Sequence, residues 1–271
     1  MAAPLRLDRS LIRVSGPDAA NFLNNLLTQD VTLLRQADVQ YAALLNPQGK
    51  VAADTLLWAD GDDCFVIETA PSFGADVVRR LSLYKLRAQI SIEDISTTLS
   101  ALWSPHLFEH ARADPRMPDG ALGWRRLAPG ADAQDGAAAY DAHRLALGIP
   151  DLTRDAAPEE VFALEALLEE LHGVDFQKGC FVGQENVSRM KRRGTTRRKF
   201  CAVRFDGEAP APGTPVLAGD IAVGTLRSSG SGQAIALLRL DRALAADAAL
   251  TAAGKPVRLT PPSWLLLPAS S

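Results

Sequence analysis

The stretch VQYAALLNPQGKVAADTLLWAD, residues 39–60, contains two apolar runs of strand length on either side of a tight turn. The runs VQYAALLN (39–46) and KVAADTLLWAD (50–60) meet at NPQG, whose Pro and Gly are typical of turns. A β-hairpin is therefore predicted here. Asp54 interrupts the second run with a carboxylate, which either faces solvent or accepts paired hydrogen bonds from the N–H and amino groups of a heterocycle.

The segments around this hairpin alternate between strand and helix patterns. Before it, SLIRVSG (10–16) alternates like a strand, and Pro17 opens an amphipathic helix pattern that continues to residue 31. After it, we expect a strand at 64–70, a helix at 72–86 and a strand at 88–96. This succession predicts an α+β fold in which an antiparallel sheet carries helices on one face.

The middle of the chain combines a loop-like composition with two helix patterns. Residues 104–140 are rich in Pro, Gly, Ala and Asp, so we expect exposed connections with one short strand near LGWRRL (122–127). A helix near 138–147 precedes a stronger helix pattern at 158–173, which has Pro158 at its start, acids in its first turn and a glycine at its end.

The last part of the chain has a different character. From residue 196 onward, short alternating runs are separated by APAPGTP, AGD, SSGSG and AAGKP, a pattern typical of a small antiparallel β-barrel. We therefore divide the chain into an α+β region, residues 1–195, and a barrel, residues 196–271.

Composition and charge exclude several classes of protein. The chain has 271 residues, 47% of them hydrophobic, and a formal net charge of −3, which is typical of a globular protein and not of a general polyanion binder. Its three cysteines, Cys64, Cys180 and Cys201, are too few and too scattered for a disulfide framework, and no Cys or His spacing indicates structural zinc. No apolar run resembles a secretory signal or a membrane span. We expect a cytoplasmic protein with free thiols and no bound metal.

The stretch DFQKGCFVGQENVSRMKRRG (175–194) places a thiol among glycines and cations. Gly179 and Gly183 let backbone approach a ligand closely, and the ammonium of Lys178 would favour the thiolate form of Cys180. Next to them, Gln184 and Glu185 offer hydrogen-bonding groups that suit the edge of a ring. The alternative is that Cys180 is an inert thiol buried in a tight loop.

A basic run, Arg189–Lys199, follows directly. Such a run either neutralises phosphates or carboxylates or forms an ordinary solvated loop. Because no aromatic residue appears before Phe200, the stacking expected of single-strand RNA readers is missing. Direct RNA contact is therefore the weaker interpretation.

These segments together resemble a known family. KGCFVGQE (178–185) followed by RMKRRG is similar to the recurring sequence of the YgfZ family, folate-binding proteins related in fold to the T-protein (aminomethyltransferase) of glycine cleavage. YKLRAQISIEDIS (84–96) resembles the second recurring segment of that family, and LLTQDV…YAALLNPQGKVAADTLLW resembles the folate domain of T-protein. The resemblance implies a split folate-binding domain, an inserted ferredoxin-like layer and a C-terminal β-barrel.

The resemblance also implies a function. It implies a bound folate such as tetrahydrofolate, held near Asp54 with help from Arg144 and Glu185, and a role in iron–sulfur cluster assembly or repair that includes support of a tRNA-modifying cluster enzyme. Iron–sulfur proteins or cluster-assembly factors would be the partners, and Cys180 would be the key residue. The chain departs from T-protein at Ala53, where an acid is expected, and by alignment at Ala146. We therefore expect folate binding without aminomethyl transfer; the alternative is a tetrahydrofolate-dependent one-carbon transferase.

Overall fold

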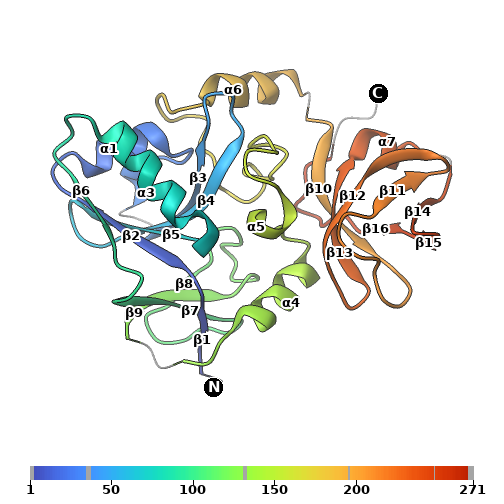
Figure 1. Cartoon of the computed structure of the whole chain (residues 1–271), viewed down its shortest axis with the longest axis horizontal. Helices are drawn as coiled ribbons and strands as arrows, with labels where there is room; N and C mark the ends of the chain where they lie inside the picture. The colour runs from blue at the N-terminus through green and yellow to red at the C-terminus, as the bar shows by residue number, and fades with distance from the viewer. Residues whose placement is uncertain (1–2, 35–37, 131–132, 195, 247, 268–271) are drawn as a thin grey trace.

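The computed structural model describes residues 3–34, 38–130, 133–194, 196–246 and 248–267, and the strands within these ranges form three antiparallel sheets. Two sheets lie in the N-terminal body, and the third closes into the barrel on the right of Figure 1. The helices α4 (Ala137–Leu147) and α5 (Leu152–Asp155) lie between the body and the barrel (Figure 1). The predicted fold class, α+β with a C-terminal antiparallel barrel, is confirmed.

The first sheet of the body contains the predicted hairpin. Its strand order is β3-β4-β5-β2-β6, with β2 at Ser10–Ser15, β3 at Val39–Leu45, β4 at Val51–Ala59, β5 at Cys64–Thr69 and β6 at Ser91–Asp94. The helices α1 (Ala19–Leu26) and α3 (Pro71–Lys85) cover one face. The other face packs against the rest of the molecule, so both faces are buried. This explains why the strands are almost continuously apolar.

Strand β4 sends alternate side chains to the two faces of this sheet. Leu56 and Trp58 join the cluster on the inner face, and Asp54 shares their parity, so its carboxylate points the same way. Ala53 and Leu57 pack in the cluster beneath α1 and α3. Asp54 is thus placed on the inner face by the two-residue period of the strand.

The second sheet and the remaining helices complete the body. The sheet order is β1-β7-β9-β8, with β1 at Leu5–Leu7, β7 at Leu99–Ser104, β8 at Arg112–Ala113 and β9 at Trp124–Pro129. A short 3₁₀ helix, η1, spans Val31–Leu33, and α6 spans Gln184–Arg193 beside the tip of the β3–β4 hairpin (Figure 1).

The barrel sheet has the order β15-β14-β11-β12-β13-β10-β16. Its elements are β10 (Arg198–Arg204), β11 (Pro215–Ala218), β12 (Ile221–Gly230), β13 (Gln233–Arg239), α7 (Leu240–Leu244), β14 (Leu250–Ala252), β15 (Lys255–Pro256) and β16 (Arg258–Leu259). The domain division at 195/196 stays a prediction, and Thr195 lies outside the described residues.

The prediction of a helix at 158–173 is wrong. Positive φ angles at Glu159 (55°), Leu167 (63°) and His172 (57°) break this segment into turns. It lies between the hairpin and the barrel, because the N–H of Val51 donates to Val161 O at 2.9 Å and the N–H of Phe200 donates to Glu165 O at 3.4 Å. Its apolar side chains are therefore buried on several sides rather than along one stripe, and tertiary packing overrides the helical pattern.

Two loop predictions also need correction. The region 104–140, expected to be exposed connections with one strand, contains both β8 and β9 and the buried residues Asp114, Arg116 and Arg125. The basic run Arg189–Lys199 is largely exposed, as the solvated-surface interpretation predicts, but its described residues lie mainly in the second half of α6 and at the start of β10 rather than in a loop. In both places charged side chains are fixed by ion pairs that composition alone does not reveal.

Candidate functional site

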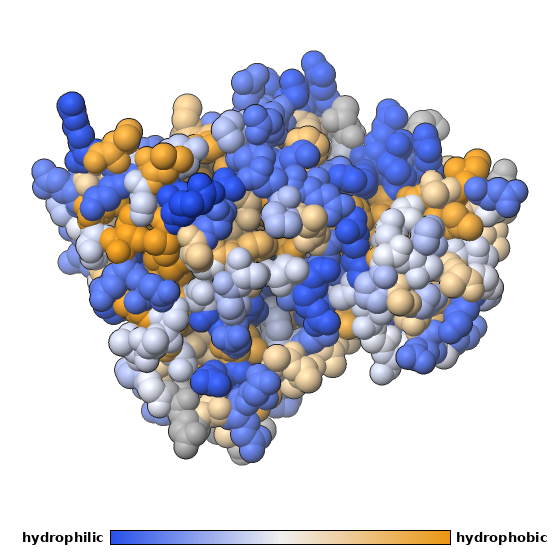
Figure 2. All heavy atoms as spheres, viewed as in Figure 1, coloured by the Kyte–Doolittle hydropathy of each residue, from blue (hydrophilic) through white to orange (hydrophobic). Residues whose placement is uncertain are grey.

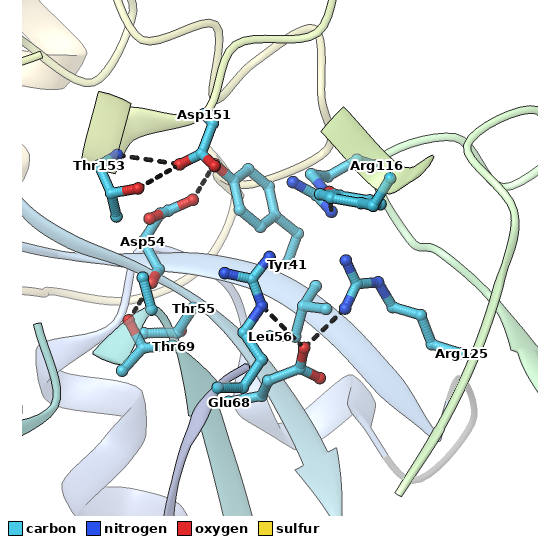
Figure 3. A pocket seen from close by; sticks show the side chains of 13 residues that line it. Tyr41, Asp54, Thr55, Leu56, Glu68, Thr69, Arg116, Arg125, Asp151 and Thr153 are labelled. Atoms are coloured by element: carbon cyan, nitrogen blue, oxygen red, sulfur yellow. Dashed lines mark hydrogen bonds and ion pairs between the residues drawn. The ribbon is translucent and has the colours of Figure 1, made fainter. Parts of the chain in front are cut away.

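A hollow opens between the two sheets of the body and helices α4 and α5. The space between its walls, counted together with the open solvent at its mouth, is about 400 Å³, and strands β3, β4, β5 and β9 contribute lining residues. Figure 3 shows Asp54 and Asp151 pointing toward each other on one side, with Arg116 and Arg125 on the other. The hollow therefore has an acidic end and a basic end.

The acidic end consists of Asp54 from β4 and Asp151 from the N-terminus of α5. The hydroxyl of Tyr41 donates to Asp54 Oδ2 at 3.2 Å. Asp151 Oδ1 accepts from the backbone N–H of Thr153 at 3.0 Å and from its hydroxyl at 2.7 Å. Burial, and then the charge of Asp151, raises the pKa of Asp54 above its ordinary value. A carboxylate destabilised in this way gains by receiving hydrogen-bond donors from a ligand.

The basic end is built around Arg125 of β9, which is only 1% exposed. Arg125 Nε donates to Asp114 Oδ2 at 2.5 Å, and Nη1 donates to Glu68 Oε1 at 2.6 Å. Arg116 binds the same Asp114 through Nε at 2.9 Å and Nη2 at 2.7 Å. Burial alone would raise the pKa of Asp114, but the two guanidiniums outweigh it and hold that pKa well below its usual range.

The charge of Asp54 leads to a prediction about stability. The pKa of Asp54 is raised in the folded state, so ionising this carboxyl lowers the stability of the fold once the pH exceeds the unfolded-state pKa of about 3.9. At lower pH the carboxyl is protonated in both the folded and the unfolded state, and the cost disappears. Asp54→Asn removes the cost. We expect the midpoint of thermal unfolding to rise by about 2–4 °C at pH 7, and the gain to shrink toward zero near pH 3. Scanning calorimetry from pH 3 to 8 tests this, and a variant less stable than wild type at pH 7 contradicts it.

Two of the predicted ligand-binding residues lie away from the hollow. Arg144 is 1% exposed, and its guanidinium is already occupied: Nε donates to Asp141 at 2.8 Å, Nη1 to Asp155 at 2.8 Å and Nη2 to Ser228 at 2.7 Å. It joins α4 and α5 to the barrel and has no group left for the carboxylates of a ligand. Glu185 is exposed in the first turn of α6 and does not line the hollow, so the structure does not bring it together with Asp54.

Lys178 has a structural role. Its ammonium donates to the backbone oxygens of Asn24 at 2.6 Å, Leu27 at 2.7 Å and Gln29 at 2.9 Å, which follow or end helix α1. Because all three donors are occupied, the ammonium is not available to activate the thiol of Cys180. Burial lowers the pKa of Lys178 to about 8, against the opposing charges of Asp30 and Asp175.

The loop that carries Cys180 lies at the tip of the hairpin. The thiol is exposed and belongs to no described wall of the hollow. Gly183 adopts a φ of 83° where a Cβ would come within 2.6 Å of Asn46 O, so glycine is required there, whereas a Cβ at Gly179 would meet nothing within 4 Å. Five residues of strand, roughly 15 Å, separate this tip from Asp54. The structure therefore does not bring the thiol of Cys180 together with Asp54 at the hollow.

The other polar residues of this segment face the surface. Gln184 Nε2 donates to Gly179 O at 3.3 Å, and Arg189 donates to Asn186 on the exposed side of α6. In the rest of the basic run, three cations pair with carboxylates of the preceding segment: Lys191 with Glu169, Arg198 with Glu165 and Lys199 with Glu170. These ion pairs leave a smaller basic surface than the sequence suggests.

The sequence analysis missed the basic end of the hollow. Asp114, Arg116 and Arg125 lie in ADPRMPDGALGWRR (113–126), for which the sequence predicts exposed connections and one short strand near LGWRRL. The available signal was the spacing Asp-x-Arg, followed by an arginine inside the short strand pattern LGWRRL, where a buried charge requires a partner. Within the described residues, no group of three His, Cys, Asp or Glu side chains is arranged to hold a metal ion.

Comparisons with known proteins agree with this fold. The GCVT N-terminal domain matches residues 9–105, and the domain described as CAF17, C-terminal beta-barrel matches residues 197–266. The crystal structure of glycine cleavage system aminomethyltransferase T from Bartonella henselae aligns with a TM-score of 0.76 over 97% of this chain and 87% of that chain, at 18% identity. The fold is therefore that of the aminomethyltransferase class, followed by a CAF17-type barrel.

Curated relatives define the family more closely. The chain is 32% identical to the human mitochondrial iron–sulfur cluster assembly factor IBA57, over 87% of this chain and 77% of the human protein. It is 30% identical to the mouse protein over the same shares, and 30% identical to the homologue of Neurospora crassa over 74% of this chain. The chain belongs to the IBA57 family of iron–sulfur cluster assembly factors. It spans only 54% of the Neurospora relative, about half its length.

These relatives correct the expected location. The human, mouse and Neurospora proteins are all mitochondrial, so the prediction of a cytoplasmic protein is contradicted. That prediction used the free thiols and the lack of long apolar runs, which proteins of a reducing organelle matrix share with cytoplasmic ones. Separately, no helix in the described part of the chain is long and apolar enough to cross a bilayer.

Proposed function

We propose that this protein is a folate-binding accessory factor for the assembly or repair of iron–sulfur clusters, and that the hollow holds a reduced folate such as tetrahydrofolate. The observation that carries the proposal is the pairing of an acidic end at Asp54 with a basic end at Arg125 across one half-enclosed site. The pyrimidine part of a pterin has N–H and amino donors beside a carbonyl acceptor, and this pattern complements such a site.

The residues present fit this ligand. Asp54 and Asp151 would receive the donors of the ring, and Tyr41 would fix the orientation of the Asp54 carboxylate. Arg125 Nη2 is buried without a hydrogen-bond partner among the described residues, so a polar ligand would satisfy it. When bound, the folate would supply a one-carbon carrier or a redox-active ring. The side chains would bind and orient it and shield it from water.

Ala53 differs from T-protein at a position that does not face the hollow. Its side chain is fully buried in the apolar cluster beneath α1 and α3, on the opposite face of β4 from Asp54. The acid expected there in T-protein is missing, and the space it would occupy is filled by apolar packing. An acid at this position would point away from the hollow, so binding without aminomethyl transfer is proposed from the resemblance alone.

The family assignment and the resemblance of KGCFVGQE support the accessory role. Within the wider family we assign the chain to a YgfZ-like group, with cluster enzymes that include a tRNA-modifying one as its clients. The partners would be iron–sulfur proteins or cluster-assembly factors that contact the exposed Cys180. Since one cysteine is too few to hold a cluster, other ligands would have to come from the partner. Direct RNA contact through Arg189–Lys199 is not needed for this role.

Titration calorimetry with tetrahydrofolate tests the folate site. We expect saturable binding with one ligand per chain, and at least a tenfold weaker affinity for Asp54→Asn because the variant offers a weaker, uncharged acceptor. The matched control is Asp63→Asn, which changes an exposed carboxylate in the turn before β5 and should leave the affinity unchanged. No binding to the wild-type protein at millimolar tetrahydrofolate contradicts the proposal.

A further inference from the structure

Two carboxylates and an aromatic ring hold the guanidinium of Arg125 in place. Its Nε and Nη1 groups are fixed by Asp114 at 2.5 Å and Glu68 at 2.6 Å. The guanidinium carbon lies 5.2 Å from the centre of the Tyr140 ring, and Tyr140 in turn accepts a hydrogen bond from Arg116 Nη2 at 2.7 Å. Among the described residues, Nη2 alone of the three guanidinium nitrogens has no partner, so the position of the group is set before any ligand arrives.

The remaining nitrogen, Nη2, makes no hydrogen bond to any described residue, although it is buried and its side chain lines the hollow. Buried charged donors are almost always paired, because an unpaired one costs at least about 1–3 kcal/mol. By contrast, Nε and Nη1 of Arg125 and Nε and Nη2 of Arg116 all donate to carboxylates. The geometry therefore points to an acceptor supplied by a ligand.

The charges around the hollow decide which kind of acceptor fits. The lining holds three carboxylates and three guanidiniums: Asp54, Glu68 and Asp151 against Arg9, Arg116 and Arg125. Asp114, which lies behind this lining and binds both Arg116 and Arg125, adds a fourth carboxylate. A further anionic group would be opposed by this surplus of negative charge. A neutral carbonyl oxygen satisfies Nη2 without adding charge. The deep position of Arg125 also favours a group on the ring of the ligand over one on a flexible tail.

We propose that Arg125 determines ligand specificity in the hollow by donating Nη2–H to the carbonyl oxygen of a bound ring, the 4-oxo group of a pterin, while the N–H groups of that ring face Asp54. This inference rests on the proposed function. It assigns the orientation of the bound ring and the preference of the site for a 4-oxo ring. A ring with an amino group in place of the 4-oxo group would place its own N–H donor against the Nη2–H donor of Arg125, so no hydrogen bond forms there. The fixed guanidinium cannot turn away, because Asp114 and Glu68 hold it.

The test compares tetrahydrofolate with its 4-amino analogue, tetrahydroaminopterin, by titration calorimetry on the wild-type chain. We expect the 4-oxo ligand to bind about 10–100-fold more tightly, the value of one charge-assisted hydrogen bond. Arg125→Lys keeps a cation between Asp114 and Glu68 but lacks the forked guanidinium, and this variant should lose most of the discrimination. Circular dichroism confirms that the variant is folded.

The outcomes separate this inference from the folate proposal itself. Equal affinity of the wild-type protein for both ligands overturns the role of Arg125 and leaves the folate site intact. A preference that persists unchanged in folded Arg125→Lys overturns it as well. If neither ligand binds the wild-type protein, the folate site itself is refuted. Because the comparison of ligands needs only the wild-type chain, a failure of the variant to fold leaves the test decisive.

Discussion

Arg144→Met is expected to destabilise the protein by about 3–5 kcal/mol, because it breaks the buried ion pair with Asp155 and leaves that carboxylate as an unpaired buried charge. Asp155 is fully buried, and besides Arg144 it accepts from the backbone N–H of Ser228 at 2.7 Å and from that of Asp151 at 2.7 Å. Arg144 thus lies at the centre of the network that fastens the barrel strand β12 to α5. Chemical denaturation followed by tryptophan fluorescence measures the loss.

The matched control is Arg154→Met. Arg154 pairs with Asp141, the same carboxylate that Arg144 contacts, but its side chain is 49% exposed, so the loss should stay below about 1 kcal/mol. Folded Arg144→Met should retain its affinity for tetrahydrofolate, since the side chain does not line the hollow. An Arg144→Met variant of wild-type stability, or one that is stable but unable to bind folate, contradicts this assignment.

Cys180→Ala is expected to reduce the support of cluster enzymes at least tenfold and to change neither the fold nor the folate affinity. The thiol is exposed, so truncation creates no cavity, and the stability should remain within about 0.5 kcal/mol of wild type. A thiolate is the form of cysteine that binds metal or attacks sulfur, and alanine cannot replace it. The measurement is the activity of a [4Fe–4S] enzyme such as aconitase in a strain whose own copy of the gene is deleted.

Cys64→Ala is the control for this experiment, because Cys64 is a half-buried thiol at the start of β5, distant in sequence from the KGCFVGQE loop. It should restore the cluster enzyme to the wild-type level. Cys201 is a less suitable control, since burial raises the pKa of its thiol to about 12 and its removal would disturb the core of the barrel. Full restoration by Cys180→Ala contradicts the proposed role of the thiol.

The sequence predicted the parts of the fold that depend on local pattern. The hairpin at 39–60, the strands β2 and β5 and the helices α3 and α4 follow from alternation, helical spacing and turn residues. The segment at 158–173 has equally strong helical spacing but forms turns. Its backbone joins the hairpin to the barrel, and these long-range contacts are absent from any local window.

The site was predicted only in part. Asp54 was found because a lone carboxylate in an apolar strand is conspicuous. Arg125 was missed because its strand is short and its partners, Asp114 and Glu68, come from two other segments. Arg144 was assigned to the ligand by resemblance, but the chain uses it to attach the barrel. Charge type can be read from a sequence, whereas the pairing that decides whether a charge is available depends on the fold.

The most direct test of the central claim is a crystal structure of the wild-type protein with tetrahydrofolate. The account predicts the pterin ring in the hollow, with its N–H groups within hydrogen-bonding distance of Asp54 and its carbonyl oxygen within hydrogen-bonding distance of Arg125 Nη2. Density for the ligand elsewhere, at the barrel or on α6, with the hollow unchanged, would contradict it.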